Sequence, residues 1–338
     1  MRNNPHVLRA NDQALSRAHD LCALDLDGVV YIGDTPVDHA ASALGEATRA
    51  GMRLAYLTNN ASKTPDEVAG KLVAVGMPAR AEDVVTSAQA AADLIAEMVP
   101  EGSEVFVIGG RGLEVALREV GLQPVSTPSD QVRAVAQGYG PDLPWRQVIA
   151  GAILVKQGLP WVASNTDLTI PTPQGHGPGN GTLVRLVADF AQREPVVAGK
   201  PEGALFETTL TRTGCDRPLM VGDRLDTDIE GGRGQGWDTL LVLTGVTGVA
   251  ELLSATPRQR PSYIGLDLRD LHRPHPAPEE REGEWTCGGW SAAVTDGSLR
   301  VNGDGAAQDW WRVVAAAGWQ HLDDTGRALD TDGLQPPR

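Results

Sequence analysis

The chain has 338 residues, of which 41% are hydrophobic, and a formal net charge of −15 at pH 7. This length allows about two or three domains, each with a core of its own. The acidic balance argues against a nucleic-acid-binding protein, because phosphate backbones attract basic surfaces. A small phosphorylated substrate is compatible with it, since a local basic or metal-lined pocket is sufficient for one phosphate group.

The cysteines and the lack of long apolar runs bear on the compartment. Cys22, Cys215 and Cys287 are too few and too far apart for a disulfide framework or a zinc site. The first twenty residues contain no apolar stretch of the kind that a secretory signal has, and no apolar run is long enough to cross a bilayer. These features predict a cytoplasmic protein without membrane insertion.

Short apolar strands alternate with helices at the start of the chain. The pattern predicts a strand at 21–27, a helix at 39–51, a strand at 52–60 and a helix at 65–76. This order is typical of a parallel sheet with helices on both faces. Sites in such sheets form at the carboxyl ends of the strands, where Asp25, Asp27 and the triplet Thr58-Asn59-Asn60 are placed.

The alternation restarts after about residue 86. Strands are predicted at 103–110, 134–139 and 160–165, and helices at 111–121 and 144–158. We interpret residues 87–185 as an inserted α/β domain. Strand ends that carry charged residues follow at 196–201 and 218–228, and a late strand follows at 239–245.

The end of the chain differs in composition. Residues 272–284 are rich in proline and charge and are typical of a linker. The small module beyond them, residues 285–338, holds five of the eight tryptophans: Trp285, Trp290, Trp310, Trp311 and Trp319. A disordered segment would not be so rich in tryptophan, and a stable domain would be larger. We therefore expect a strand–turn–strand–helix module whose tryptophans form a core and which docks on the main body or on a partner.

Four polar clusters follow predicted strands: Asp25 with Asp27, residues 58–60, Lys200, and the acidic segment from Asp223 to Asp228. Clustered carboxylate oxygens suit Mg²⁺, and lysine with Thr/Asn donors suits a phosphoryl group. Asp25 can then act as a carboxylate nucleophile. A turn at Gly28 could bring Asp27 back to the substrate, where it would protonate the leaving oxygen and later activate water.

The other polar residues take supporting roles. Asp223 would hold Mg²⁺, and Lys200 would neutralise charge between Asp25 and the phosphoryl group. Thr58 and the Asn59 amide would bind phosphoryl oxygens. Asn60 is a substrate-binding candidate, with the alternative that it only caps the following turn.

The segments DLDGVV, LTNNAS, AGKP and GDRLDTDI, in this order, resemble the four motifs of haloacid dehalogenase (HAD) superfamily phosphatases. The inserted domain resembles the type II α/β cap of the NagD-like subclass IIA, and the resemblance covers roughly residues 20–270. It implies a Rossmann-like parallel-sheet core of residues 1–86 and 186–271, with the cap at 87–185. It also implies Asp25 as nucleophile, the Asp27 side chain as acid/base, and metal binding by Asp25, the Asp27 carbonyl and Asp223, supported by Asp228.

The cap departs from this resemblance at one place. Related proteins tend to carry Gly-Phe/Tyr-Asp where this chain has Gly138-Tyr139-Gly140, and Asp142 stands where pyridoxal phosphatases have a histidine. The departure argues against pyridoxal phosphate as the substrate. It makes the loop from Tyr139 to Trp145 the expected place of substrate selection and Asp142 a substrate-binding candidate.

The C-terminal module resembles the tail of bacterial glycerol 3-phosphate phosphatases of this subclass, which has been likened to a fragment of an acetyltransferase fold. The resemblance implies a Mg²⁺-dependent phosphatase that hydrolyses glycerol 3-phosphate, a small phosphorylated metabolite, through a phospho-aspartate. A phosphatase for 2-phosphoglycolate or a sugar phosphate is the enzymatic alternative. A non-catalytic phospholigand sensor and a protein whose tail has its own chemistry are alternatives of other classes. The oligomeric state stays open, with a homodimer through the cap or the tail among the outcomes.

Overall fold

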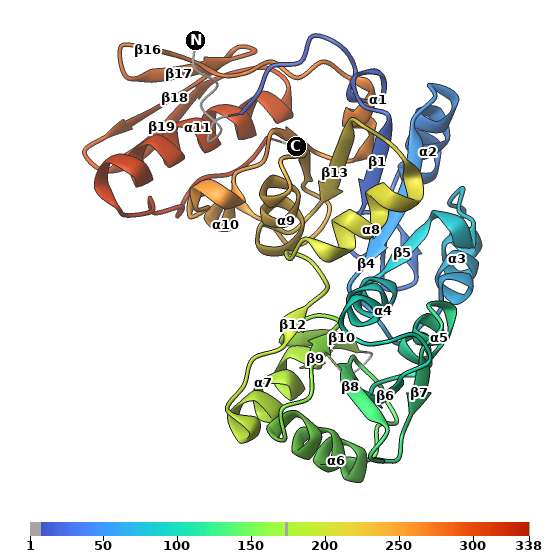
Figure 1. The fold of residues 1–338 in the computed structure, drawn as a ribbon. Coiled ribbons are helices and arrows are strands. Elements are labelled where there is room, and N and C mark those ends of the chain that lie inside the picture. Colours follow the sequence, from blue (N-terminus) through green and yellow to red (C-terminus); the bar gives the residue numbers. More distant parts are fainter. Residues whose placement is uncertain (1–7, 173–174, 338) are drawn as a thin grey trace. The chain divides into compact units, whose positions relative to one another are not determined.

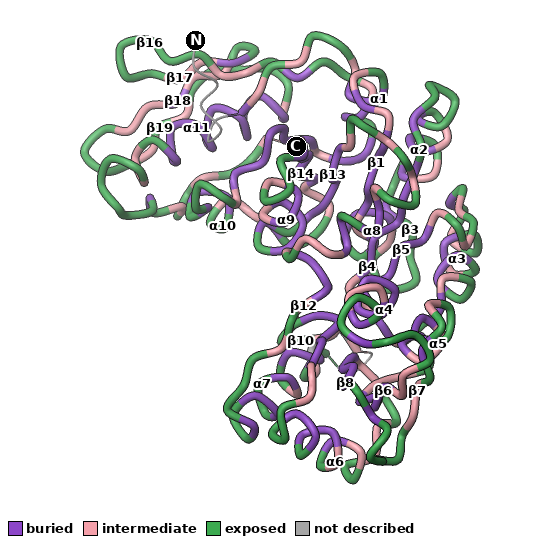
Figure 2. The backbone as a smooth tube through the Cα atoms, viewed as in Figure 1, coloured by how far each residue is buried: buried purple, intermediate pink, exposed green. Residues whose placement is uncertain are grey.

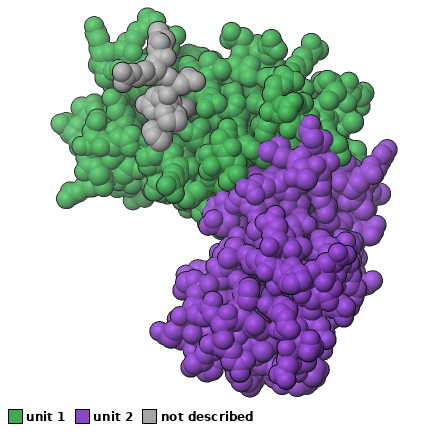
Figure 3. Space-filling view, in the orientation of Figure 1, with its two compact units in different colours: residues 1–54, 75–78, 215–338 green, residues 55–74, 79–214 purple. Residues whose placement is uncertain are grey.

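A computed structural model describes residues 8–172 and 175–337, and it divides into two compact α/β units (Figures 1 and 3). Unit 1 consists of residues 1–54, 75–78 and 215–338, and unit 2 of residues 55–74 and 79–214. Unit 1 therefore contains the first strand and the C-terminal module together. The predicted domain boundaries, near residues 86, 185 and 271, stay a prediction.

Unit 1 is built on parallel strands in the order β15-β14-β13-β1. Their bounds are β1 (Leu21–Leu24), β13 (Pro218–Gly222), β14 (Asp238–Val242) and β15 (Tyr263–Gly265). All four residues of β1 are buried, as its apolar sequence predicts (Figure 2). Strand β1 ends at Leu24, three residues before the predicted end, and this early end frees the two acids from the alternation of a strand.

Strand β4 (Arg53–Thr58) begins in unit 1, where the Arg53 N–H donates to the Asp20 carbonyl (2.9 Å), and continues into unit 2 beside β5 (Val84–Thr86). Unit 2 also has a parallel sheet in the order β12-β9-β8-β6-β7. Its strands are β6 (Glu104–Ile108), β7 (Gln123–Val125), β8 (Val132–Gln137), β9 (Trp161–Ala163) and β12 (Val196–Val197). The hairpins β2 (Tyr31–Ile32)/β3 (Thr35–Pro36) and β10 (Thr169–Thr172)/β11 (Gly175–Pro178) lie in units 1 and 2 respectively.

Helices alternate with these strands. Unit 1 has α1 (Leu15–Ala18), α2 (Ala40–Arg49), α9 (Glu230–Gly234), α10 (Val249–Leu253) and α11 (Ala307–Thr325). Unit 2 has α3 (Pro65–Ala74), α4 (Ser87–Met98), α5 (Arg111–Glu119), α6 (Trp145–Lys156), α7 (Asn180–Ala191) and α8 (Ala204–Thr213). The predicted alternation of strands and helices is confirmed, whereas α4, α7 and α8 are additions to it. Along the described ranges, none of these helices is both long and apolar enough to cross a membrane.

The C-terminal module is an antiparallel sheet with one long helix. Its strands β16 (Glu279–Arg281), β17 (Glu284–Cys287), β18 (Trp290–Thr295) and β19 (Ser298–Gly303) pair in chain order, and α11 lies on the sheet (Figure 1). The predicted strand–turn–strand–helix order is confirmed. Strand β16 lies in the segment predicted as a linker and adds an exposed edge strand to the sheet.

The module docks on the main body of unit 1 through its helix, as predicted. The apolar cluster at this contact contains Trp310, Trp311 and Trp319 of α11. It also contains Leu241 of β14 and Ile264 of β15. The prediction that these helix tryptophans form core is confirmed. Truncating one such buried aromatic typically costs about 3–5 kcal/mol.

A buried polar network crosses the same contact. Arg312 of α11 donates to the Ile264 carbonyl (3.2 Å) and to Nδ1 of His275 (3.0 Å). Because Nδ1 accepts, the Nε2–H of His275 donates to the Asp270 carbonyl (2.8 Å), and the imidazole is neutral. Burial lowers the pKa of His275 to about 4, and the Arg312 charge acts in the same direction.

This network predicts a pH-dependent stability. The folded-state pKa of His275 lies below its unfolded value, so the unfolded chain takes up the proton first as the pH falls. Stability is complete above about pH 6.5 and falls toward pH 4, by about 1.4 kcal/mol per pH unit. His275→Gln keeps a donor and an acceptor without titrating. Urea unfolding at pH 7.5 and 5.0 should show a loss about 2 kcal/mol larger for the wild type; equal losses would contradict the assignment.

Candidate active site and metal centre

The chain turns sharply directly after β1. The Asp25 N–H donates to the Val221 carbonyl of β13 (2.9 Å), so this residue still lies at the edge of the sheet. Gly28 then takes the left-handed conformation (φ +86°), and its N–H donates to the Tyr31 carbonyl (2.8 Å). The turn predicted at Gly28 is confirmed, and it keeps Asp25 and Asp27 in one short loop.

Asp223 lies against the backbone of this turn. It follows β13 and is 1% exposed. A Cβ added at Gly28 would come within 2.4 Å of the Asp223 Oδ2, and one at Gly245 within 1.9 Å. Glycine at both positions is therefore what allows the carboxylate to approach the two loops so closely.

The loop of residues 244–248, which follows β14, holds this arrangement with three hydrogen bonds. The Val246 N–H donates to the Asp223 Oδ2 (2.9 Å), and the Thr247 hydroxyl donates to the Asp223 carbonyl (2.6 Å). The Thr244 hydroxyl donates to the Gly28 carbonyl (2.5 Å). Sequence reasoning missed this loop, although its threonines and glycines at a predicted strand end were a usable signal.

Asp228 lies in the short helical turn η2 (Leu225–Ile229) and is fully buried. Its Oδ2 accepts from the Arg224 N–H (3.1 Å). Asp226, by contrast, is exposed and forms an ion pair with the Arg224 guanidinium (2.8 Å). The structure thus buries Asp228, the supporting acid that the resemblance implies, and leaves Asp226 at the surface.

Three carboxylates meet at this place. Asp25, Asp223 and Asp228 each offer an oxygen within 4.8 Å of the others. Oxygen donors of this kind are the ligands that hard divalent cations prefer. Like charges so close repel one another, and a bound cation would offset this repulsion. The residues therefore fit the predicted metal site, to which Asp27 was predicted to contribute its backbone carbonyl.

Asp27 and Tyr31 lie opposite each other in the turn, where they form an isolated backbone bridge. The Asp27 side chain is exposed, as an acid/base that exchanges protons with water requires. Burial raises the pKa of Tyr31, and the charges of Asp25 and Asp27 raise it further. Tyr31, which the sequence did not single out, therefore keeps its phenol proton beside both acids.

In unit 2, β4 ends at Thr58, which is buried. Its hydroxyl accepts from the Asn60 N–H (3.1 Å). The Asn60 Oδ1 accepts from the backbone N–H and the hydroxyl of Ser62 (2.9 and 2.7 Å). The alternative of a turn cap for Asn60 thus matches the contacts of its side-chain oxygen.

Asn59 holds the backbone of Lys200 from both sides. Its Oδ1 accepts from the Lys200 N–H (2.8 Å), and its Nδ2 donates to the Lys200 carbonyl (3.0 Å). Lys200 itself is only 3% exposed. The structure therefore joins two of the predicted motifs in unit 2, and the Asn59 side chain contacts a neighbouring site residue.

Three further residues fix Asn59, and sequence reasoning assigned a role to none of them. The Asp167 carboxylate accepts from the Asn59 Nδ2 (3.2 Å to each oxygen). The Asn59 carbonyl accepts from Asn165 Nδ2 and from the Ser87 hydroxyl (both 2.6 Å). Asn165 ends the strand predicted at 160–165 and Asp167 follows it, and this position at a strand end was the available signal.

Asp142, the substrate-selection candidate, is exposed in the turn that precedes α6. The backbone of this loop lies close to the glycines after β6: a Cβ added at Gly140 would come within 2.9 Å of the Gly109 carbonyl carbon. The loop therefore has a fixed start, and its part in substrate selection stays a prediction.

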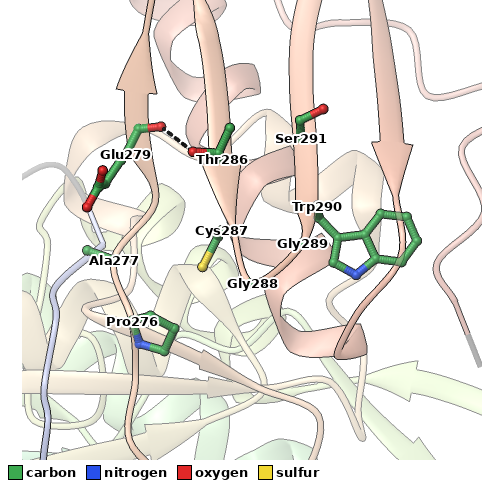
Figure 4. Close-up of a pocket in the computed structure, with 9 residues that line it drawn as sticks. All are labelled: Pro276, Ala277, Glu279, Thr286, Cys287, Gly288, Gly289, Trp290 and Ser291. Atoms are coloured by element: carbon green, nitrogen blue, oxygen red, sulfur yellow. Dashed lines mark hydrogen bonds between the residues drawn. The ribbon is translucent and has the colours of Figure 1, made fainter.

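The C-terminal module contains a cavity of about 470 Å³ whose lining includes Glu279, Cys287 and Trp290 (Figure 4). Burial raises the pKa of the Cys287 thiol to about 12, helped by the charge of Asp309. Its Sγ donates to Asp309 (3.5 Å). A thiol that keeps its proton is a poor nucleophile, so the cavity does not support separate thiolate chemistry in the tail.

Two family models match the chain: "Haloacid dehalogenase-like hydrolase" over residues 22–123 and "HAD-hydrolase-like" over residues 197–271. D-glycerol 3-phosphate phosphatase of Mycobacterium tuberculosis is 38% identical over 321 residues, 91% of this chain and 88% of that protein. An acid sugar phosphatase of Staphylococcus haemolyticus is 35% identical over 247 residues, 72% of this chain and 92% of that protein. The crystal structure of the M. tuberculosis glycerol phosphate phosphatase in complex with magnesium matches with a TM-score of 0.83, 38% identity and coverage of 92% and 93%.

The carboxylate cluster generates a prediction on metal binding. Asp228→Asn should weaken Mg²⁺ binding at least about tenfold, because groups around a metal site typically contribute 10- to 100-fold in affinity. Asp226→Asn is the matched control and should change the dissociation constant less than about twofold, since an exposed ion pair contributes little. Isothermal titration calorimetry measures both constants. Equal effects of the two changes would contradict the place of Asp228 in the site.

Proposed function

The chain belongs to the haloacid dehalogenase-like hydrolases and is a phosphoric monoester hydrolase. We propose that it hydrolyses glycerol 3-phosphate with Mg²⁺ through a phospho-aspartate on Asp25. The observation that carries this proposal is the meeting of Asp25, Asp223 and Asp228 at adjacent strand ends. A carboxylate nucleophile beside a cation site is the arrangement that phosphoryl transfer to aspartate requires.

The metal would be held by Asp25, the Asp27 carbonyl and Asp223, with Asp228 in support. When bound, Mg²⁺ shields the negative charge of the phosphoryl group from the attacking carboxylate. The hydrogen bonds from the 244–248 loop keep the Asp223 carboxylate in position for this task. The magnesium complex of the mycobacterial relative supports the choice of cation.

The reaction has two transfers. A carboxylate oxygen of Asp25 attacks phosphorus, the ester P–O bond breaks, and Asp27 gives its proton to the departing glycerol oxygen. Asp27 then takes a proton from water, whose oxygen attacks the phosphorus. The bond between phosphorus and the Asp25 oxygen breaks, and inorganic phosphate and the free carboxylate result. The exposed position of Asp27 supports this exchange with water.

Lys200 and Thr58 bind the phosphoryl group in this proposal. The Lys200 ammonium neutralises charge on the phosphoryl group, and the Thr58 hydroxyl donates to a phosphoryl oxygen. Because the Asn59 side chain contacts both backbone groups of Lys200, its main part is the placement of that lysine. Asn60 shapes the same loop through its contacts with Ser62.

Glycerol 3-phosphate is supported by the extent of the similarity. The match to the mycobacterial D-glycerol 3-phosphate phosphatase covers 91% of this chain, against 72% for the staphylococcal acid sugar phosphatase. The glycerol part of the substrate offers two hydroxyl groups that can donate. Asp142, an exposed carboxylate in the loop expected to select the substrate, can accept such a bond.

The placement of Lys200 by Asn59 can be tested by exchanging the side chains of Asn59 and Asp167. Asn59→Asp places a second carboxylate beside Asp167 and removes the donor to the Lys200 carbonyl, so kcat/KM should fall about a hundredfold. Adding Asp167→Asn restores a donor–acceptor pair and should recover part of the loss. Steady-state phosphate release measures both variants. If the double variant is no better than Asn59→Asp, the contact with Asp167 does not place Lys200.

The proposed reaction is tested by phosphate release from a panel of glycerol 3-phosphate, 2-phosphoglycolate, glucose 6-phosphate and pyridoxal phosphate, with Mg²⁺ or with EDTA. Glycerol 3-phosphate should give the highest kcat/KM, and EDTA should abolish release. Asp25→Asn should lower kcat at least about a thousandfold, as removal of a nucleophile does. Acid quenching during turnover of labelled substrate should trap label on the wild type and none on the variant.

A different result would contradict each part of the proposal. A higher kcat/KM for another ester would overturn the substrate, and equal release by Asp25→Asn would overturn the nucleophile. Binding of the esters without release by the wild type would favour the phospholigand sensor. Asp226→Asn serves as a carboxylate control, because that exposed residue pairs with Arg224 outside the cluster.

A further inference from the structure

The loop that holds Asp223 continues directly into a short helix. Residues 244–248 lead into α10, where Gly248 accepts from the Leu252 N–H (3.0 Å) and donates to the Glu251 carboxylate (3.0 Å). These bonds tie the end of the loop to the first turn of α10. The position of α10 therefore determines where Val246 and Thr247 present their donors to Asp223.

Helix α10 is too short to be stable by itself, and α11 of the C-terminal module supports it. The Trp319 indole N–H donates to the Leu252 carbonyl, the last turn of α10 (2.7 Å). At the neighbouring position, Gly318 leaves room for Leu253: a Cβ there would come within 2.3 Å of the Leu253 Cδ2. The two helices are thus in direct contact through a hydrogen bond and a close approach.

A buried arginine secures the end of α10. The guanidinium of Arg260, 2% exposed, donates to both oxygens of Asp323 on α11 (2.6 and 2.7 Å). Its Nε donates to the Ala255 carbonyl, two residues beyond α10 (3.3 Å), and it lies over the Trp319 ring (5.4 Å). The segment after α10 is therefore attached to the same face of α11.

The apolar cluster of α11 also includes residues on either side of the other buried acid, Asp228. Leu225 and Ile229, the first and last residues of η2, belong to the same apolar cluster as the tryptophans of α11. Asp228 lies between them in the sequence. The 244–248 loop, which donates to Asp223, is thus tied to α10, and the turn that carries Asp228 shares an apolar cluster with the C-terminal helix.

We propose that the C-terminal module contributes to the metal centre: α11, through Gly318 and Trp319, positions α10 and the 244–248 loop so that Asp223 binds the cation. Gly318 and Trp319 are positioning residues that act through other groups. The inference rests on the proposed function, because that function supplies Mg²⁺ as the cation. It gives the module a role in the phosphatase reaction without any chemistry of its own.

The experiment uses substitutions in α11 that displace α10 and leave α11 itself stable. Gly318→Ala favours the helix itself, since alanine is the better helix former, and its new methyl group meets Leu253 of α10. Trp319→Phe is the second variant, which removes the donor to Leu252. Trp285→Phe is the matched control, because that indole N–H bonds to Gln320 within the module (2.6 Å).

Isothermal titration calorimetry of the full chain with Mg²⁺, without substrate, is the first measurement. Gly318→Ala and Trp319→Phe should raise the Mg²⁺ dissociation constant about threefold to tenfold, at the lower end of the range for groups around a metal. Trp285→Phe should change it less than about twofold. At saturating Mg²⁺, phosphate release by Gly318→Ala should return to within about twofold of the wild type, because only the position of the metal ligands is disturbed.

Unchanged Mg²⁺ affinity in a folded Gly318→Ala overturns the proposal, and so does an equal loss in Trp285→Phe. If Trp319→Phe does not fold, as judged by circular dichroism, Gly318→Ala decides alone. Failure of the proposed function has a different signature: the wild type then binds no Mg²⁺, or Asp228→Asn binds it as well as the wild type does. A wild type that binds Mg²⁺ through Asp228, with no effect of Gly318→Ala, leaves the function intact and overturns only the role of the module.

Discussion

The carboxylate site of unit 1 is constrained by the mutual repulsion of three acids. Asp25, Asp223 and Asp228 lie within 4.8 Å of one another, and the last two are buried. Charges of one sign at such distances in a poorly polarisable interior oppose folding by several kcal/mol unless donors and a cation compensate. The backbone donors of Val246 and Arg224 supply part of this compensation. We propose that a small divalent cation bound at this site removes the remaining repulsion.

Unit 2 also contains a buried charged group that is held in place by polar neighbours, and its charge is positive. Lys200 is a buried cation whose backbone is fixed by the neutral amide of Asn59, and Asp167 accepts from the nitrogen of that amide. The position of Asp223 in unit 1 and that of Lys200 in unit 2 are set by polar groups from segments far away in the sequence. In the proposed mechanism, different residues therefore carry the charge that acts on the substrate and hold that charge in place.

This division explains how far the sequence could predict the structure. Strands such as β1 and β4, and the polar residues that follow them, were predictable because apolar periodicity and strand-end polarity are local features. Val246 and Asp223 are 23 residues apart in the sequence, and Asn59 and Lys200 are 141 residues apart. Hydrogen bonds between such distant residues produce no periodic pattern in the sequence. Strand β16 was not predicted for a related reason. Its exposed, charged side chains are typical of a linker, and it joins the sheet only through its backbone.

Buried polar groups also fix how the C-terminal module docks on the main body. An apolar helix face could dock in several registers, whereas Arg312 must meet the Ile264 carbonyl and a neutral His275 at once. Buried polar groups left without partners would cost about 1–3 kcal/mol each, so only one register satisfies them. The tryptophans thus supply the attraction and the polar network supplies the orientation. Because that orientation places Trp319 against α10, the docking of the module and the geometry of the carboxylate cluster are fixed by one set of contacts.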